Sequence, residues 1–147
     1  MAFNLSSTVA EEETMAWIDA WFLEIWTNAS SASLSANVAD PFTFHLPGGR
    51  RQQISHDSYL TYLQLWRQKF KSLTFSIADV ISQPPLTVVR YRCQAQYQGG
   101  WLSIPGKKQV IQMTGMIQFR HEEGQISECW LEDSSFDLYQ QLTGYLK

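Results

Sequence analysis

The stretch VVRYRCQAQY, residues 88–97, decides the fold because its apolar and polar side chains alternate. One set of alternate positions holds Val89, Tyr91, Cys93, Ala95 and Tyr97. The other set holds mainly arginines and glutamines. A period of two is typical of a β-strand with one buried and one polar face. The stretch therefore predicts a strand of an antiparallel sheet that is covered on one side only.

The neighbouring sequence predicts four further strands, over residues 42–46, 73–83, 109–120 and 126–134. Pro47-Gly48-Gly49 breaks the first of these, and Pro84-Pro85 ends the second. The turn over residues 121–124 joins the last two, so that they run antiparallel. The C-terminal half of the chain is thus expected to form a meander of long strands.

The remaining segments have helical periodicity. Thr8 and Glu11 have the spacing of a capping box, and apolar residues recur after it at three- and four-residue intervals: Met15, Ile18, Phe22, Ile25 and Trp26. We expect a short second helix over residues 30–39 that ends before Pro41, a third helix capped by Ser55, and a last one over residues 136–142. Trp17 and Trp21 widen the first apolar stripe. Such indoles either pack deep in a core or line a ligand cavity.

Helices followed by a meander of strands predict a single α+β domain over residues 1–147. A twisted antiparallel sheet of this kind curls into a cone whose concave face the helices cover. The interior of that cone is either plugged by side chains or open to a small ligand.

Composition excludes several classes of protein. Hydrophobic residues make up 44% of the 147 residues, which is enough for a core, but no apolar run approaches the ~20 residues of a membrane span. The N-terminus lacks the basic and apolar regions of a signal peptide, so we expect a cytoplasmic protein that is not attached to a membrane. No dense basic stripe occurs, and the pairs Arg50-Arg51 and Lys107-Lys108 are isolated, which disfavours nucleic-acid binding.

Cysteine and histidine usage indicates neither a disulfide framework nor a metal site. Cys93 and Cys129 are expected to be buried, reduced and slow to react. The three histidines are far apart, with no carboxylate at ligand spacing. We therefore expect no metal and no cofactor.

Five ordered segments resemble the SnoaL-like polyketide cyclases of the nuclear-transport-factor-2-like superfamily. They are FTFHLPGG (42–49), IPGK (104–107), TGMIQFR (114–120), GQISECW (124–130) and LYQQL (138–142). The resemblance covers nearly the whole chain. It implies a curled sheet with three covering helices, and an intramolecular aldol condensation that closes a ring without a cofactor or metal.

The resemblance also implies two acid–base positions, and both differ in this chain. The aspartate that follows the family's tryptophan by four residues is Ser134 here. The histidine that precedes the loop between the long strands is Tyr97. Cyclase activity therefore requires other groups, with Tyr97 as a candidate donor to a developing enolate.

Strand parity ranks the substitutes for the missing base. If the face of Trp130 looks into the cone, Glu132 does so too, and it becomes the best candidate base. Asp133 lies on the opposite face unless a bulge reorients it. His45 alternates out of phase with its apolar neighbours, which favours a structural or interfacial role over catalysis.

The polar face of residues 88–97 has two interpretations. This face consists of Arg90, Arg92, Gln94 and Gln96. In the first interpretation it is the outer face of the sheet and contacts solvent or a second copy of the chain. In the second it is the wall of a pocket that holds an anion. We expect a homodimer that pairs through this face.

Two functional hypotheses remain open at this point. In the first, the cone binds a small, largely apolar molecule, with cofactor-free cyclisation or isomerisation, between walls drawn from Trp21, Trp26, Tyr97, Met113 and Trp130. In the second, the chain is a non-catalytic homodimeric interaction module whose cone is filled by its own side chains. The volume of the cavity distinguishes the two.

Overall fold

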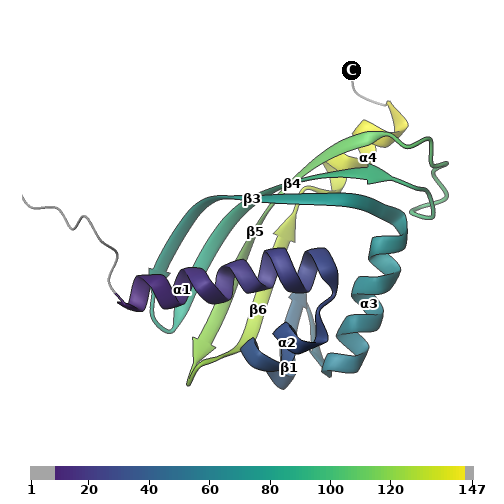
Figure 1. Cartoon of the computed structure of the whole chain (residues 1–147). Helices are drawn as coiled ribbons and strands as arrows, with labels where there is room; N and C mark the ends of the chain where they lie inside the picture. Colours follow the sequence, from purple (N-terminus) through teal and green to yellow (C-terminus); the bar gives the residue numbers. More distant parts are fainter. Residues whose placement is uncertain (1–8, 145–147) are drawn as a thin grey trace, which may run out of the picture.

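The computed structural model describes residues 9–144 and has the expected α+β architecture (Figure 1). Six strands form one sheet in the order β2-β1-β6-β5-β4-β3. Their bounds are Val38–Leu46 (β1), Arg50–Ile54 (β2), Phe70–Gln83 (β3), Leu86–Tyr97 (β4), Val110–Glu122 (β5) and Gln125–Asp133 (β6). Neighbouring strands are antiparallel except for β1 and β6, which are parallel. The sheet is curled but not closed, since β2 and β3 form its two edges.

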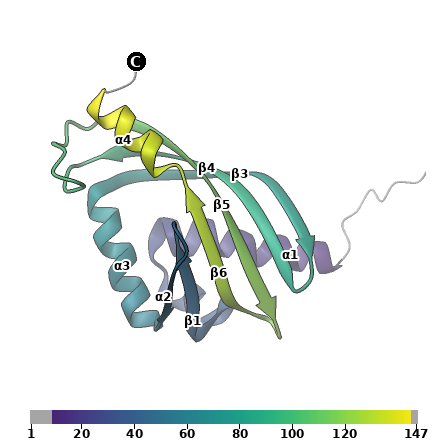
Figure 2. The same cartoon turned by 180° about the vertical axis from the view of Figure 1, so that it is seen from behind.

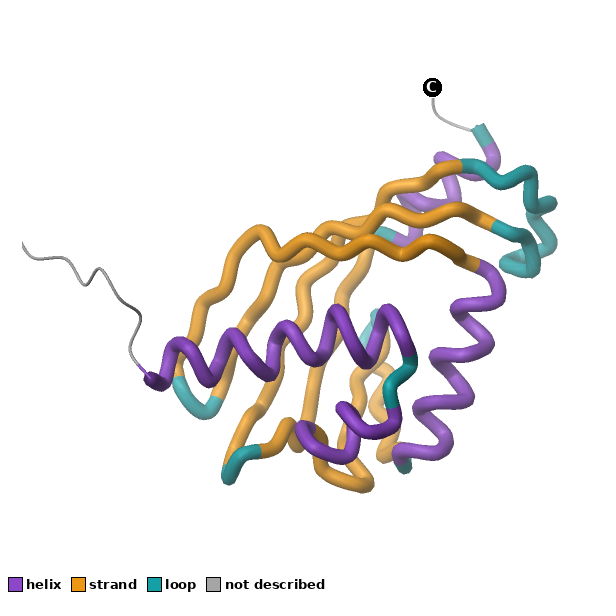
Figure 3. Tube along the Cα trace, viewed as in Figure 1, coloured by secondary structure: helices purple, strands orange, loops and turns teal. Residues whose placement is uncertain are grey.

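Helices cover the concave face of this sheet. They are α1 (Val9–Asp19), the π-helix η1 (Ala20–Trp26), α2 (Ser31–Asn37), α3 (His56–Lys69) and α4 (Ser135–Thr143). Helix α1 lies across the strands, and α3 stands at one end of the sheet (Figure 3). From behind, β5 and β6 face the viewer and α1 lies beyond them (Figure 2). Among the described residues, no helix is long and apolar enough to cross a membrane.

The alternation in β4 has the expected structural consequence. Val89, Tyr91, Cys93, Ala95 and Tyr97 are buried, each at most 5% exposed. The intervening Arg90, Arg92 and Gln94 are exposed. Val89 and Tyr91 belong to one core cluster with residues of α1 and η1: Trp17, Ile18, Trp21, Phe22 and Ile25. Ala95 and Tyr97 belong to a second cluster, with Phe70, Ile104, Ile111 and Leu138. Burial of these aromatic and aliphatic side chains is the main source of stability for the layer of helices on the sheet.

Capping fixes the ends of two helices. Ser55 precedes α3, and its side chain accepts a hydrogen bond from the backbone N–H of Ser58. Gly144 ends α4 in the left-handed conformation, with φ of 67°. Both ends agree with the sequence-based expectation. Thr8, the expected cap of the first helix, lies outside the described residues.

The main differences from expectation concern the second helix, strand β1 and strand β2. The second helix ends at Asn37 because Val38 starts β1, where it is buried and pairs with Ile126 of β6. Strand β2 was not expected, since Arg50–Ile54 has no apolar alternation. Its pairing with β1 across the turn at Gly48 and Gly49 makes it an edge strand, where polar residues are favoured.

Candidate active site

A cavity of about 100 Å³ lies between the concave face of the sheet, helix α3 and the start of α4. Most of its lining is aromatic or aliphatic: Trp26, Phe44, Tyr59, Leu63, Trp66, Phe70, Phe75, Trp101, Met113, Leu131 and Leu138. The polar contributions come from Tyr62, Tyr91, Cys93, Asp133, Ser134 and Ser135. Asp133 and Ser135 are exposed, and Tyr62 is 39% exposed. These three residues therefore mark the mouth of the cavity.

Within the described part of the chain, Asp133 is the only charged residue that lines the cavity. It ends β6, directly before α4. The Oδ1 atom accepts hydrogen bonds from the backbone N–H and the hydroxyl of Ser135. These contacts orient the carboxylate, and Oδ2 has no hydrogen-bond partner among residues 9–144. One carboxylate oxygen is thus available to a ligand.

Two phenols share the cavity with this carboxylate. Burial raises the pKa of Tyr62, and the negative charge of Asp133 raises it further, whereas Arg50 lowers it. Burial also raises the pKa of Tyr91, again with a contribution from Asp133. Both hydroxyls therefore keep their protons at neutral pH and are hydrogen-bond donors to a ligand.

The expected orientation of β6 is wrong. Cys129 and Leu131 are buried and Asp133 lines the cavity, whereas Glu132 is exposed and lies outside the lining. Glu132 does share a face with Trp130, as strand parity predicts, but that face is the outer one. Within β6 only Ile126 departs from this parity, because Arg120 pairs with Glu128 and His121 pairs with Ile126, so that Ser127 is skipped. Such a bulge moves the side chains beyond it to the opposite face.

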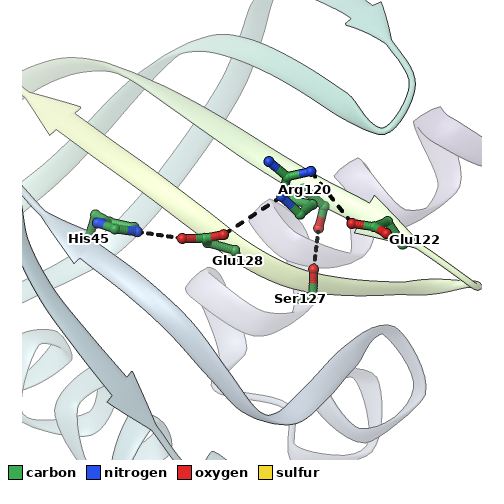
Figure 4. A network of polar contacts seen from close by, with 5 residues as sticks. All are labelled: His45, Arg120, Glu122, Ser127 and Glu128. Carbon is green, nitrogen blue, oxygen red and sulfur yellow. Dashed lines mark hydrogen bonds and ion pairs between the residues drawn. The ribbon is translucent and has the colours of Figure 1, made fainter.

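Trp130 and His45 accordingly lie on the outer face of the sheet rather than in the cavity. Their rings stack at a centroid distance of 4.8 Å with an interplanar angle of 9°. The Nε2 atom of His45 lies 2.6 Å from Oε2 of Glu128 (Figure 4). Arg120 continues this network, with ion pairs to Glu128 at 3.7 Å and to Glu122 at 3.6 Å. This position agrees with a structural or interfacial role for His45 and separates it from the cavity.

Tyr97 is not in the cavity lining either. Its hydroxyl donates to the carbonyl of Ile104 at 2.7 Å and accepts from the backbone N–H of Trp101 at 3.0 Å. These bonds anchor the loop between β4 and β5. The expectation that Tyr97 donates to an enolate is therefore wrong, because its hydroxyl is already occupied.

The remaining candidates divide between core and cavity. Trp26, Met113 and Ser134 line the cavity, and their part in ligand binding stays a prediction. Trp21 is fully buried, with its ring against Phe42 and Phe119, and is not a cavity wall. The arginines of β4 lie on the outer face, where Nε of Arg90 donates to Asp79 at 2.7 Å, so this strand face is not the wall of an anion pocket.

Sequence reasoning missed Tyr62, Tyr91, Trp66 and Trp101 as lining residues. The alternation of residues 88–97 contained the signal for Tyr91, because it shares a face with Tyr97. Tyr62 had no such signal, since it lies beside the apolar stripe of α3 rather than in it.

Both cysteines are free and buried, as expected. Burial raises the pKa of Cys93 to about 12 and places that of Cys129 well above its usual value. In the described part of the chain, no group of three or more His, Cys, Asp or Glu side chains could hold a metal ion.

Comparison with known structures extends these observations. The fold is similar to that of a candidate polyketide cyclase from Acidithiobacillus ferrooxidans, with a TM-score of 0.82 and 17% identity over 97% of this chain and 99% of that one. It is also similar to IdmH, a candidate polyketide cyclase from Streptomyces antibioticus, with a TM-score of 0.76 and 19% identity over 88% and 97%. AclR, a candidate hydroxylase from Streptomyces galilaeus, gives a TM-score of 0.74 and 13% identity over 93% and 98%. At these identities the similarity concerns the fold.

Sequence comparison identifies the family. No match was found among curated proteins. The sequence profile of the SnoaL-like polyketide cyclases, however, matches residues 16–142, which include every element that lines the cavity. The chain belongs to the SnoaL-like polyketide cyclase family.

Proposed function

We propose that the protein binds a small, largely apolar carbonyl compound in this cavity and catalyses cofactor-free acid–base chemistry on it. The observation that carries the proposal is the position of Asp133, a carboxylate with one free oxygen at the wall of an otherwise aromatic cavity. Family membership supports aldol cyclisation or isomerisation as the reaction class.

Asp133 is the candidate general base in this proposal. Its Oδ2 takes a proton from a carbon next to a carbonyl group, and the electron pair of the C–H bond passes to the carbonyl oxygen as an enolate. In an aldol cyclisation the enolate carbon then attacks a second carbonyl, whose oxygen becomes a hydroxyl by taking the proton back from Asp133. In an isomerisation Asp133 returns its proton to another carbon of the same enolate.

The size of the cavity limits what can be bound. A volume of about 100 Å³ is below the ~300–1,000 Å³ of typical ligand sites. A single ring fits inside, and a larger substrate extends through the mouth beside Tyr62 and Ser135. The space also favours ligand binding over the alternative of an interaction module with a filled cone.

A binding and turnover screen tests the proposal. The probes are polyketide-like esters and unsaturated ketones, with binding followed by the fluorescence of the lining residues Trp26, Trp66 and Trp101. Native mass spectrometry of freshly purified protein adds a search for a co-purifying molecule. We expect saturable binding of at least one unsaturated ketone and its conversion with chelator present. Absence of both binding and conversion across the panel contradicts the proposal.

We also propose that two copies of the chain pair through the outer face of the sheet. The exposed Arg90, Arg92 and Gln94 of β4 and the 50% exposed Met116 of β5 support an isologous interface there. Sedimentation at micromolar concentration is expected to give twice the chain mass of 16.9 kDa. The variant Met116→Glu buries a carboxylate at that interface, next to the paired residue Glu132, and is expected to shift the protein toward the monomer. A monomeric parent protein contradicts this proposal.

A further inference from the structure

Gly115 occupies the centre of a row of three residues that crosses the floor of the cavity. Tyr91 of β4 pairs with Gly115 of β5, and Gly115 pairs on its other side with Asp133 of β6. A phenol and a carboxylate that both line the cavity are therefore separated by one residue without a side chain.

The ring of Tyr91 uses the space that Gly115 leaves. A Cβ atom built at Gly115 would lie 2.3 Å from the hydroxyl oxygen of Tyr91 and 2.5 Å from its Cζ atom. Neither distance is sterically allowed, so the phenol rests directly on the glycine. This position extends the hydroxyl across β5, toward the strand that carries Asp133.

The hydroxyl of Tyr91 has no hydrogen-bond partner among residues 9–144 and belongs to a side chain that lines the cavity. Tyr91 as a whole is only 5% exposed. Two other buried tyrosines, in contrast, have hydrogen-bond partners within the protein. Tyr59 accepts a hydrogen bond from the indole of Trp26 at 2.7 Å, and Tyr97 is bonded to Ile104. Tyr91 thus differs from them in having a free donor at the cavity wall, which a ligand can complete.

We infer that Tyr91, placed by Gly115, donates a hydrogen bond to the carbonyl oxygen of the substrate, beside the carbon from which Asp133 takes the proton. This inference rests on the proposed function and adds the group that stabilises the enolate. As the C–H bond breaks, the proton moves to Oδ2 of Asp133 and the negative charge moves to the oxygen that Tyr91 holds. A donor aimed at such an oxygen typically contributes ~10²–10³-fold to the rate.

The same geometry defines the class of substrate as a neutral carbonyl compound. No lysine or arginine of the described residues lines the cavity, and the carboxylate of Asp133 repels carboxylates and phosphates. Aromatic walls and neutral phenol donors accommodate a ketone or an ester without its own charge.

The infrared spectrum of a bound ketone tests this hydrogen bond directly and without turnover. The probe is 2-cyclohexenone with a ¹³C label at the carbonyl, added to an excess of protein. In the parent protein the carbonyl band is expected to shift to lower frequency than in an apolar solvent. In Tyr91→Phe the shift is expected to disappear and the dissociation constant to rise about tenfold. Tyr139→Phe, whose ring belongs to α4 outside the lining, is the matched control and is expected to retain both values.

Each outcome decides the inference. An unchanged carbonyl band in Tyr91→Phe overturns it, as does a lack of saturable binding of the probe at tens of millimolar. Circular dichroism establishes that each variant is folded. The proposed function fails separately, when an active substrate is found and Asp133→Asn turns it over at the parent rate while the Tyr91 hydrogen bond persists.

Discussion

Glu132 and Asp133 are consecutive in the chain and lie on opposite faces of the sheet at the end of β6. Asp133 lines the cavity with one free carboxylate oxygen, whereas Glu132 is exposed on the outer face opposite Met116 of β5. The two carboxylates therefore form a natural pair of test and control. A substitution at either position changes the net charge equally but changes the charge of the cavity at one of them only.

Gly115 and Tyr91 are expected to be coupled in stability. Gly115→Ala places a methyl group against the phenol, and overpacking of this kind typically costs about 1–3 kcal/mol of unfolding free energy. In a Tyr91→Ala background the clashing ring is absent, so the same substitution is expected to cost much less. Urea unfolding of the four proteins in this double-mutant cycle measures the coupling. Equal costs of Gly115→Ala in both backgrounds contradict the contact.

The two thiols are expected to react slowly with a disulfide reagent in the folded protein. Burial raises the pKa of Cys93 to about 12, so at pH 8 only about one thiol in 10⁴ is a thiolate, which is the reactive form. The rate is expected to increase as the pH rises toward that value, and to become fast in urea. Absorbance assays at pH 8 measure it. Complete labelling of the native protein within seconds would show that these thiols are accessible.

Acid is expected to weaken the packing of α1 on the sheet through His121. Its ring stacks on Trp17 at 4.5 Å, and burial lowers its pKa below the usual 6.5. The unfolded chain therefore binds a proton from about pH 6.5 downward while the folded chain resists it, so stability falls as the pH decreases below this value. His121→Phe keeps an aromatic ring and removes the titration.

Melting temperatures between pH 7.5 and pH 5.5 test this expectation. The parent protein is expected to lose more stability over this interval than His121→Phe, with identical buffers and protein concentration. The two proteins are compared by the change within each series, since their absolute stabilities differ. Parallel curves for the two proteins would exclude His121 as the group responsible.

The alternation of residues 88–97 was sufficient to predict the buried face of β4, because one regular strand has one parity throughout. In β6 the parity of residues 128–133 was also correct, but the face of Trp130 was assigned to the cavity instead of the outside. A bulge at Ser127 places Ile126 and Cys129 on the same buried side although they are separated by an odd number of positions. A bulge depends on the partner strand and has no signature in a single sequence.

The outward position of Trp130 was also outside the reach of sequence reasoning. An indole in a strand is expected to face the core, but this one is half-buried on the outer face by its stack on His45. These two residues come from β6 and β1, which are far apart in the chain and become neighbours only through parallel pairing. The assignment of Tyr97 as a donor to the substrate failed for a similar reason, since the loop contacts that occupy its hydroxyl depend on the folded structure.

Turnover of an active unsaturated ketone by Asp133→Asn and Glu132→Gln, measured side by side with the parent protein, tests the central claim most directly. Both substitutions remove one negative charge and change few atoms. The position of Asp133 in the cavity predicts that Asp133→Asn lowers kcat by ~10²–10⁴-fold with nearly unchanged ligand affinity, as expected for loss of a general base. Glu132→Gln is expected to retain the parent kcat. Full turnover by Asp133→Asn, or a comparable loss in Glu132→Gln, would contradict the assignment of Asp133 as the base.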